Sequence, residues 1–408
     1  MTSPLPYKQH CIFCKSAYHD YRHCPLAFRM RTLRLKNLDA KQEYVGQSPS
    51  VFVGHYGYPK VNVGFLNVEQ YTEEDEPLKW SRENKQILEI IDLRTSLINS
   101  TFQSDVKSLT GKLLEMGQEI GMARMPADME IRLSKKPVFA TTFQQDAQPH
   151  GPNIRLEQAR LTENVKVDSR IEKVVDDADL KSGPALVKLF RKGVDEHKLT
   201  RLLSIGDLGV KPQRKLVPTR WSITAVDDTL GKQLITEVKT FQESDCRVYI
   251  GGYLGNNYVI MLFDDLWSYE LFEGYVPLLR TRGEVAWETD YENYNGRTEY
   301  ANQTVGGYYA ARLSILEGLR REGRQAGVLA LRFVTTEYSA PLGVWVVREA
   351  VRKALAAKPL VFGDRDLMRR YVKEYCERAF GFDVTSTLEH RSRLLKNLKI
   401  QKRLQQWL

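Results

Sequence analysis

The sequence has no long apolar run, and its best stretches, such as residues 259–263, are only as long as a strand. A helix that crosses a bilayer needs about 20 predominantly apolar residues, so we expect no membrane partner. The first six residues also lack the charged and apolar blocks of a secretory signal. These absences predict a cytoplasmic protein.

The common catalytic motifs are also missing. The chain contains no phosphate-binding P-loop, no dinucleotide-binding glycine motif, no H-E-x-x-H and no G-x-S-x-G. The glycines at 251, 252 and 255 fall in a strand-and-turn context, which favours a hairpin over a phosphate cradle. The sequence therefore leaves open whether the protein is an enzyme, and it predicts no catalytic residue.

Cysteine is scarce, with five in 408 residues, and the odd number argues against a disulfide framework. Three of the five lie within the first 24 residues, in the pattern C-x2-C-x4-H-x4-C. Two thiolates and a later His–Cys pair at this spacing can surround a tetrahedral ion with no open position. The predicted ligands of this structural Zn²⁺ are Cys11, Cys14, His19 and Cys24.

Two details of this zinc-knuckle module stay open. His23 adjoins Cys24 and is an alternative to His19, whereas His10 is a weaker competitor. The plainer alternative is a set of reduced, unliganded thiols. A knuckle with aromatic and basic side chains can hold nucleic acid, or it can simply pack against the main body.

Positive charge gathers at the two ends of the chain. The net charge is +9; residues 1–37 carry seven Lys and Arg against one Asp, and residues 389–408 carry six against one Glu. The long middle is nearly neutral. Basic ends on a neutral body indicate contact with a polyanion, of which DNA is the simplest example, because phosphate neutralisation supplies most of such affinity.

The last eight residues have the pattern Q-x-x-h-x-x-a-h and resemble the PIP box, a short motif that binds the PCNA sliding clamp. In one helical turn three of its side chains share a face, at i, i+3 and i+4. These three side chains form a plug for an apolar pocket of the clamp. The glutamine amide can reach a separate polar pocket. The motif residues are Gln401, Leu404, Trp407 and Leu408. The alternative is an amphipathic terminal helix that docks on its own domain.

For the body between these ends, the sequence pattern predicts an α+β fold with an antiparallel sheet flanked by helices. Two strands with a Gly/Tyr/Pro turn are expected in 49–68, and a loop in 141–160. The expected helices fall in 81–122, 170–204, 308–323, 342–357 and 364–380. The expected strands are 222–226, 234–241, 247–250, 258–263, 269–276 and 328–334. The predicted organisation is a zinc module (1–30), the body (31–388, with an internal boundary near 141–160) and a basic tail with the clamp motif (389–408).

A few side chains in the body combine charge with an aromatic face, which suits contact with a nucleotide or nucleic acid. They are His55, Tyr56, Arg220, Trp221 and Asp227. The alternative for Arg220 is an ion pair with a core carboxylate beside a buried Trp221. The alternative for His55 and Tyr56 is an ordinary surface turn.

Together the terminal motifs and several body segments resemble one family, the archaeal Nre proteins (NreA/NreB type), which are DNA-repair factors. The body segments are residues 48–64, 216–228, 306–312 and 341–349. The resemblance implies a role in the DNA-damage response, recruitment to DNA by the clamp, and contact with other repair proteins at the nucleoid. It brings no catalytic residues.

Three hypotheses follow from these observations. The first is a DNA-repair factor that the clamp recruits. The second is an enzyme that acts on a nucleotide-like ligand or on DNA, with His55, Arg220, Trp221 and Asp227 lining one cleft. The third is a non-catalytic adaptor whose ends bind partners. The second and third are both compatible with the first.

Overall fold

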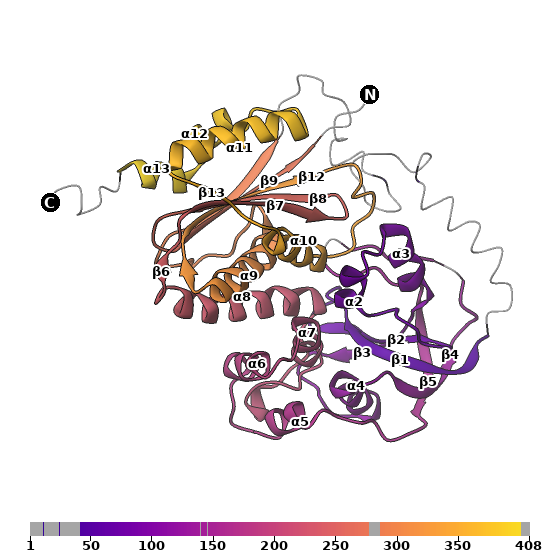
Figure 1. The fold of residues 1–408 in the computed structure, drawn as a ribbon. Helices are drawn as coiled ribbons and strands as arrows, with labels where there is room; N and C mark the ends of the chain where they lie inside the picture. The colour runs from indigo at the N-terminus through magenta and orange to yellow at the C-terminus, as the bar shows by residue number, and fades with distance from the viewer. Residues whose placement is uncertain are drawn as a thin grey trace. The chain divides into compact units, whose positions relative to one another are not determined.

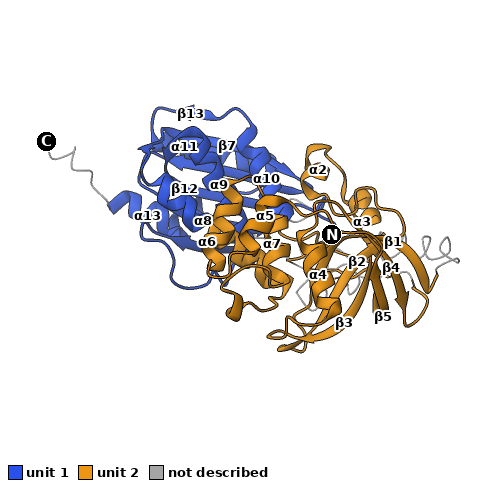
Figure 2. Ribbon diagram, turned by 90° about the horizontal axis from the view of Figure 1, so that it is seen from below, with its two compact units in different colours: residues 1–10, 231–339, 345–408 blue, residues 11–230, 340–344 orange. Residues whose placement is uncertain are grey.

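A computed structural model describes Cys11, Cys24 and residues 41–138, 140–144, 146–276 and 286–400. The chain divides into two units, which are described separately below (Figure 2). Unit 2 comprises Cys11–Leu230 and Ala340–Val344, and unit 1 comprises Met1–His10, Gly231–Ser339 and Trp345–Leu408. The predicted zinc module and clamp motif fall almost wholly outside the described residues.

Five strands of unit 2 form a closed barrel in the order β1-β2-β3-β5-β4 (Figure 1). Neighbouring strands are antiparallel, except that β3 and β5 are parallel. The only helix between β3 and β4 is α4 (Lys112–Met122). This order, with one parallel pair and a helix between the third and fourth strands, is the topology of an OB-fold. The strands are β1 (Glu43–Val53), β2 (Lys60–Val68), β3 (Ile98–Asp105), β4 (Ala127–Leu133) and β5 (Asn153–Leu161).

The alternation of side chains along each strand fills the barrel. In β4 every second residue is buried, namely Ala127, Met129, Ile131 and Leu133. They join apolar side chains of the other strands, of α4 and of the segment around Ile205 in one core cluster. Closure leaves no strand edge unpaired, so the connecting loops are held by the barrel itself.

The remaining helices of unit 2 lie in the segments that follow β2 and β5. Between β2 and β3 lie α2 (Pro77–Arg82) and α3 (Ile87–Ser96), the latter begun by a capping box in which Gln86 N donates to Glu89. After β5 come α5 (Ser169–Val175), α6 (Ser182–Arg191), α7 (Glu196–Ser204) and the 3₁₀ turn η2 (Lys211–Gln213). Asp195 caps α7 by accepting from His197 N and Lys198 N.

Unit 1 is built on a six-stranded sheet in the order β10-β9-β12-β8-β7-β13. Its central strand β12 is buried at every position, as expected for a strand covered on both faces. The strands are β7 (Cys246–Tyr253), β8 (Asn256–Phe263), β9 (Ser268–Tyr275), β10 (Trp287–Glu292), β12 (Gly327–Val334) and β13 (Leu360–Phe362). A separate pair is β6 (Gln242–Glu243) with β11 (Arg324–Gln325).

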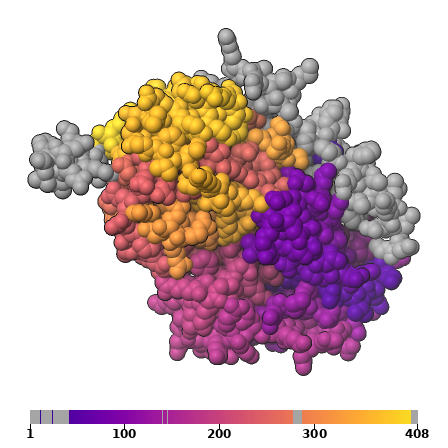
Figure 3. Space-filling model, in the orientation of Figure 1, coloured from indigo at the N-terminus to yellow at the C-terminus, as the bar shows by residue number. Residues whose placement is uncertain are grey.

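Helices cover both faces of this sheet. On one face α10 (Trp345–Ala356) contacts β7, β8 and α9 (Val305–Glu322). The approach is close, because a Cβ at Gly251 of β7 would lie 2.7 Å from the Ala354 Cα. On the other face lie α11 (Arg365–Phe380), α12 (Thr385–Arg391) and α13 (Arg393–Ile400). Their outer sides form one continuous yellow surface in Figure 3.

The expected strands 222–226 and 234–241 are wrong, because residues Thr219–Val238 form one long helix, α8. The segment is rich in β-branched residues, which favour strands locally. Ser222, Val226, Leu230, Leu234 and Val238 are buried, whereas residues 224, 228, 232 and 236, midway between them, are not. A strand would place both sets on the same face, and a helix places them on opposite faces. Tertiary burial therefore overrides the local preference. The boundary between the two units falls inside this helix, after Leu230.

Other expectations are confirmed or need correction. Mixed helices and strands are confirmed, as are the strand pair in 49–68 and the strands near 247–250, 258–263, 269–276 and 328–334. The sheet is not wholly antiparallel, since β9 and β12 run parallel, and the barrel is a second sheet. Residues 98–105 and 153–161 are strands of the barrel, where the sequence predicted a helix and a loop. No described helix is long and apolar enough to span a membrane.

A buried ion pair fixes α9 to the sheet of unit 1. Arg312 Nη1 lies 2.7 Å from Glu292 Oε2, and both side chains are at most 1% exposed. Tyr308 and Trp267 also donate to the Glu292 carboxylate. A buried carboxylate that loses its cation costs far more than a broken surface pair.

We therefore expect Arg312→Met to lower the free energy of unfolding by about 3 kcal/mol or more. The matched control is Arg320→Met on the same helix, whose pair with Glu237 is half-exposed and should cost less than about 1 kcal/mol. Urea unfolding followed by tryptophan fluorescence measures both. Equal losses in the free energy of unfolding would show that the buried pair contributes no more than the half-exposed one.

Candidate functional site

The turn between β1 and β2, residues 54–59, presents aromatic side chains to solvent. Gly57 has φ +82°, and a Cβ there would lie 2.7 Å from Lys60 O, so the turn needs glycine at this point. Tyr56 is 80% exposed and Tyr58 48% exposed. The His55 and Tyr56 rings lie 4.1 Å apart, centroid to centroid. Exposed rings held by a tight turn form a preformed stacking surface.

The start of α8 lies beside this turn. The Thr219 hydroxyl accepts a hydrogen bond from Val53 N at 2.9 Å, at the end of β1, and lies 3.0 Å from Ser204 Oγ. This contact brings the next two residues, Arg220 and Trp221, to the β1–β2 turn. The Trp221 ring is 46% exposed and lies 5.3 Å from the Tyr58 ring.

The long loop between β4 and β5 reaches the same place. Arg220 Nε lies 2.5 Å from Asp146 Oδ2 of that loop. Burial, and next the nearby Arg220, hold the pKa of His55 below its ordinary value, while Asp146 opposes them. These surroundings therefore favour the neutral form of His55. We call His55, Tyr56, Tyr58, Arg220 and Trp221 the rim cluster.

The structure thus brings together four of the five side chains selected from the sequence. His55, Tyr56, Arg220 and Trp221 meet at one end of the barrel, whereas Asp227 is 1% exposed, two turns further along α8. Arg220 does form an ion pair, but with a carboxylate of the β4–β5 loop and not of the core, and Trp221 is not a core residue either. Sequence reasoning missed Tyr58, although its position in the same turn was a usable signal.

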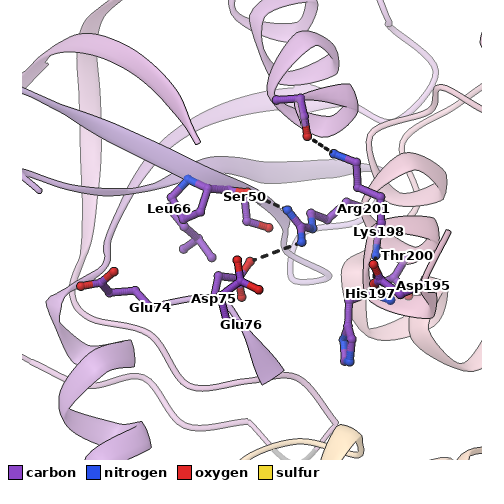
Figure 4. Close-up of polar contacts among 12 residues, drawn as sticks. Ser50, Leu66, Glu74, Asp75, Glu76, Asp195, His197, Lys198, Thr200 and Arg201 are labelled. Atoms are coloured by element: carbon purple, nitrogen blue, oxygen red, sulfur yellow. Dashed lines mark hydrogen bonds and ion pairs between the residues drawn. The ribbon is translucent and has the colours of Figure 1, made fainter. Parts of the chain in front are cut away.

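A second polar feature of unit 2 is a charged cavity of about 250 Å³. Figure 4 shows Arg201 directed at Asp75, with Lys198 beside it on α7. Arg201 donates to Pro49 O at 2.7 Å, and its Nη2 lies 4.0 Å from Asp75 Oδ2. The other Asp75 oxygen pairs at 2.6 Å with the buried Arg94. The carboxylate therefore lies between two guanidinium groups.

Lys198 is the most perturbed cation at this cavity. It is 8% exposed, and its Nζ donates to Ala123 O at 2.5 Å. Burial, and next the charge of Arg201, lower its pKa from 10.5 to about 7. An amine of this kind is partly neutral at physiological pH and can act as a base or a nucleophile.

The predicted zinc ligands are only partly described. Cys11 and Cys24 are buried, at 0% and 3% exposure, and neither forms a disulfide. Buried reduced thiols are suitable donors for Zn²⁺. Cys14, His19 and the alternative His23 lie outside the described residues, as do Gln401, Leu404, Trp407 and Leu408 of the clamp motif. Among the described residues no group of three or more His, Cys, Asp or Glu could hold a metal.

Comparison with known proteins covers nearly the whole chain. The model described as "Archaeal Nre, N-terminal" matches residues 20–279, and "Archaeal Nre, C-terminal" matches residues 292–407. The chain is 37% identical to DNA repair protein NreA of Haloferax volcanii over 79% of its length and 80% of that protein. It is 36% identical to DNA repair protein NreB of Archaeoglobus fulgidus over 94% of its length and 97% of that protein. DNA repair protein NreA of the same organism is 37% identical over 87% and 91%. No solved structure matches the chain significantly.

The lowered pKa of Lys198 predicts a pH dependence of stability. Between pH 7 and 10.5 the unfolded chain holds a proton at this lysine that the folded chain has lost. The free energy of unfolding should therefore rise with pH in this window. Relative to Lys198→Met, the wild-type value should gain about 2 kcal/mol or more between pH 7 and pH 10.

Chemical unfolding at a series of pH values measures this difference. The control is Lys188→Met on α6, where the lysine is exposed and its removal should leave the pH dependence unchanged. If the wild type and Lys198→Met had parallel profiles, the folded protein would keep Lys198 protonated.

Proposed function

This chain belongs to the archaeal Nre family, and we propose that it is a DNA-repair factor of the DNA-damage response that the PCNA sliding clamp recruits to DNA. One observation carries the repair role. Three relatives called DNA repair proteins are 36–37% identical to the chain over 79–94% of its length. Similarity of this extent covers both units and is not confined to one short motif.

The described end of the chain supports the clamp motif as the recruiting element. Helix α13 is held at its start by the Glu270 carboxylate, which accepts from Ser392 Oγ, Arg393 N and Leu394 N. Its apolar stripe is buried at Leu394 and Leu395. The stripe therefore docks on its own unit there, as the alternative interpretation of the tail predicted.

That docking weakens before the motif begins. Leu398 is only half-buried, and Ile400, the residue directly before Gln401, is 77% exposed. Lys396 and Lys399 are exposed on the same helix. A basic, exposed approach suits a motif that binds an acidic clamp surface or lies close to DNA. We propose that Leu404, Trp407 and Leu408 form the plug and that Gln401 occupies the polar pocket.

We propose a structural Zn²⁺ for the N-terminal module. Its ligand spacing and the buried, reduced state of Cys11 and Cys24 support this site. A module of about 20 residues has almost no core, so the metal would supply most of its folding free energy. The zinc would complete a small fold and leave catalysis to other parts of the chain.

An enzyme acting on a nucleotide-like ligand or on DNA is the second candidate. The observation in its favour is the charged cavity with Lys198, whose pKa of about 7 suits a base or a nucleophile. A non-catalytic adaptor is the third candidate, and turnover of a nucleotide or DNA substrate that is lost in Lys198→Met would exclude it. Both roles are compatible with recruitment by the clamp.

Clamp recruitment predicts loss of binding when the plug is removed. We expect the wild type to bind the clamp with a micromolar Kd, about −8 kcal/mol, and Trp407→Ala to cost about 2 kcal/mol or more. Calorimetry with purified clamp measures both values. The control is Trp221→Ala, because that tryptophan is exposed and lies outside the tail. Unchanged binding by Trp407→Ala would remove the recruitment proposal but leave the family assignment standing.

The zinc site predicts one bound metal ion per chain. Elemental analysis of the purified protein should give about one zinc per chain, and Cys14→Ser should lose most of it. Cys246→Ser is the control, because that thiol lies in the sheet of unit 1 and contacts Asp264. Protein that is free of metal but folded throughout would contradict the site.

A further inference from the structure

The five-stranded barrel of unit 2 has exposed positions on the outer face of β2 and β3. In barrels of this topology the β2–β3 face and the β1–β2 and β4–β5 loops are the parts that bind oligonucleotides or oligosaccharides. Lys60 and Asn62 of β2 and Gln103 of β3 are exposed, and Asn62 pairs with Gln103 in the strand register. The outer face is therefore open and polar where β2 leaves the rim cluster.

Aromatic side chains stand at the end of this face. Tyr56, Tyr58 and Trp221 are 46–80% exposed and come from two separate segments, the β1–β2 turn and the start of α8. The Thr219–Val53 hydrogen bond holds these segments together. Planar rings fixed at the mouth of a barrel offer stacking surfaces for unpaired bases, and every base has a face that can stack.

Cationic side chains lie on the segments that meet at the base of the turn. Val106 N donates to Pro59 O, and Leu216 N donates to Val106 O, so three segments of the chain lie side by side at the base of the turn. Each segment carries an exposed lysine next to that contact, namely Lys60, Lys107 and Lys215. Arg220 adds a guanidinium whose Nε faces Asp146 and which has further N–H donors. Asp105 and Asp146 are acidic residues of the same segments, and the four cations outnumber these two.

We propose that this surface binds single-stranded DNA, with bases stacked on Tyr56, Tyr58 and Trp221 and phosphates held by Lys60, Lys107, Lys215 and Arg220. The inference rests on the proposed repair function for the choice of DNA as the ligand. Stacking needs exposed base faces, which a duplex hides inside its helix, so the rings select single strands. An uncharged oligosaccharide would not need four cationic side chains.

A binding titration tests this assignment on the full-length protein. A fluorescein-labelled 12-nucleotide DNA of mixed sequence is titrated with the wild type and with Tyr56→Ala/Trp221→Ala, and anisotropy is recorded. We expect the double variant to bind about tenfold more weakly or worse, since each stacked base contributes strongly. Tyr294→Ala is the matched control, because that tyrosine is 42% exposed in unit 1 and should leave binding unchanged. Equal binding by the double variant and the wild type would overturn the proposal.

Charge variants provide a second measurement that does not depend on the rings. Lys60→Gln/Lys107→Gln removes two of the proposed phosphate contacts. The slope of log K against log salt concentration should then become shallower by about 1.4, or 0.7 for each phosphate on a single strand. An unchanged slope would remove these lysines from the interface. Trp221→Phe keeps a ring, so it should bind like the wild type while losing part of the fluorescence quenching that DNA causes.

The competing ligands are arms of the same experiment. Duplex DNA of the same sequence should bind more weakly than the single-stranded DNA, and a preference for duplex DNA or for RNA would overturn the assignment. Clamp binding is measured on the same preparations. A rim variant that loses DNA binding but keeps clamp binding supports the DNA-binding surface. Clamp binding that is lost only in Trp407→Ala supports recruitment by the clamp and does not bear on the DNA-binding surface. The two proposals therefore fail separately.

Discussion

The closure of the five-stranded barrel is the constraint on which unit 2 depends. Strand β1 pairs along one edge with β2 and along the other with β4, and a bulge between Gln47 and Ser50 lets one strand serve both. The parallel pairing of β3 with β5 completes the ring. Because every strand has two partners, the β1–β2 turn starts from a fixed base, and the Thr219 hydroxyl ties α8 to the same point. The rim cluster forms because strand pairing fixes the β1–β2 turn and the Thr219 hydrogen bond holds the start of α8 beside it.

Buried charge has a comparable role in each unit. Arg94 in unit 2 bonds to Asp75, Glu74 O and Pro149 O, and so joins the segment before α2 to the end of the β4–β5 loop. Arg312 in unit 1 joins α9 to β10 through Glu292. Such pairs add little net stability over an apolar core, but they penalise any arrangement that separates them. Lys198 differs, because burial and the nearby charge of Arg201 lower its pKa to about 7. A lysine that is only partly protonated contributes little to a structural ion pair. Its position suits chemistry better than scaffolding.

Sequence reasoning succeeded where local pattern and burial agree. The strand around 258–263 is apolar and aromatic, the strand around 328–334 is apolar except for Arg332, and both are buried on both faces, so their type was predictable. It failed at α8, where β-branched residues favour strands, but burial alternates every two residues between 222 and 238, which fits a helix and not a strand. It also failed at β5, a polar segment whose place in the barrel depends on partners 20 to 60 residues away. For the site, the side-chain types of His55, Tyr56, Arg220 and Trp221 were recognisable, but their proximity was not.

The sequence by itself determined the residue types and spacings at the two ends, the basic charge there and the family resemblance. These properties depend on short stretches of chain, and the family comparison bears out the resemblance. Only the tertiary structure decided that the β1–β2 turn and the start of α8, about 165 residues apart, form one surface. It also decided that Asp227 is buried and that Lys198 is poorly solvated. Proximity and desolvation arise from the packing of distant segments, and no local pattern records them.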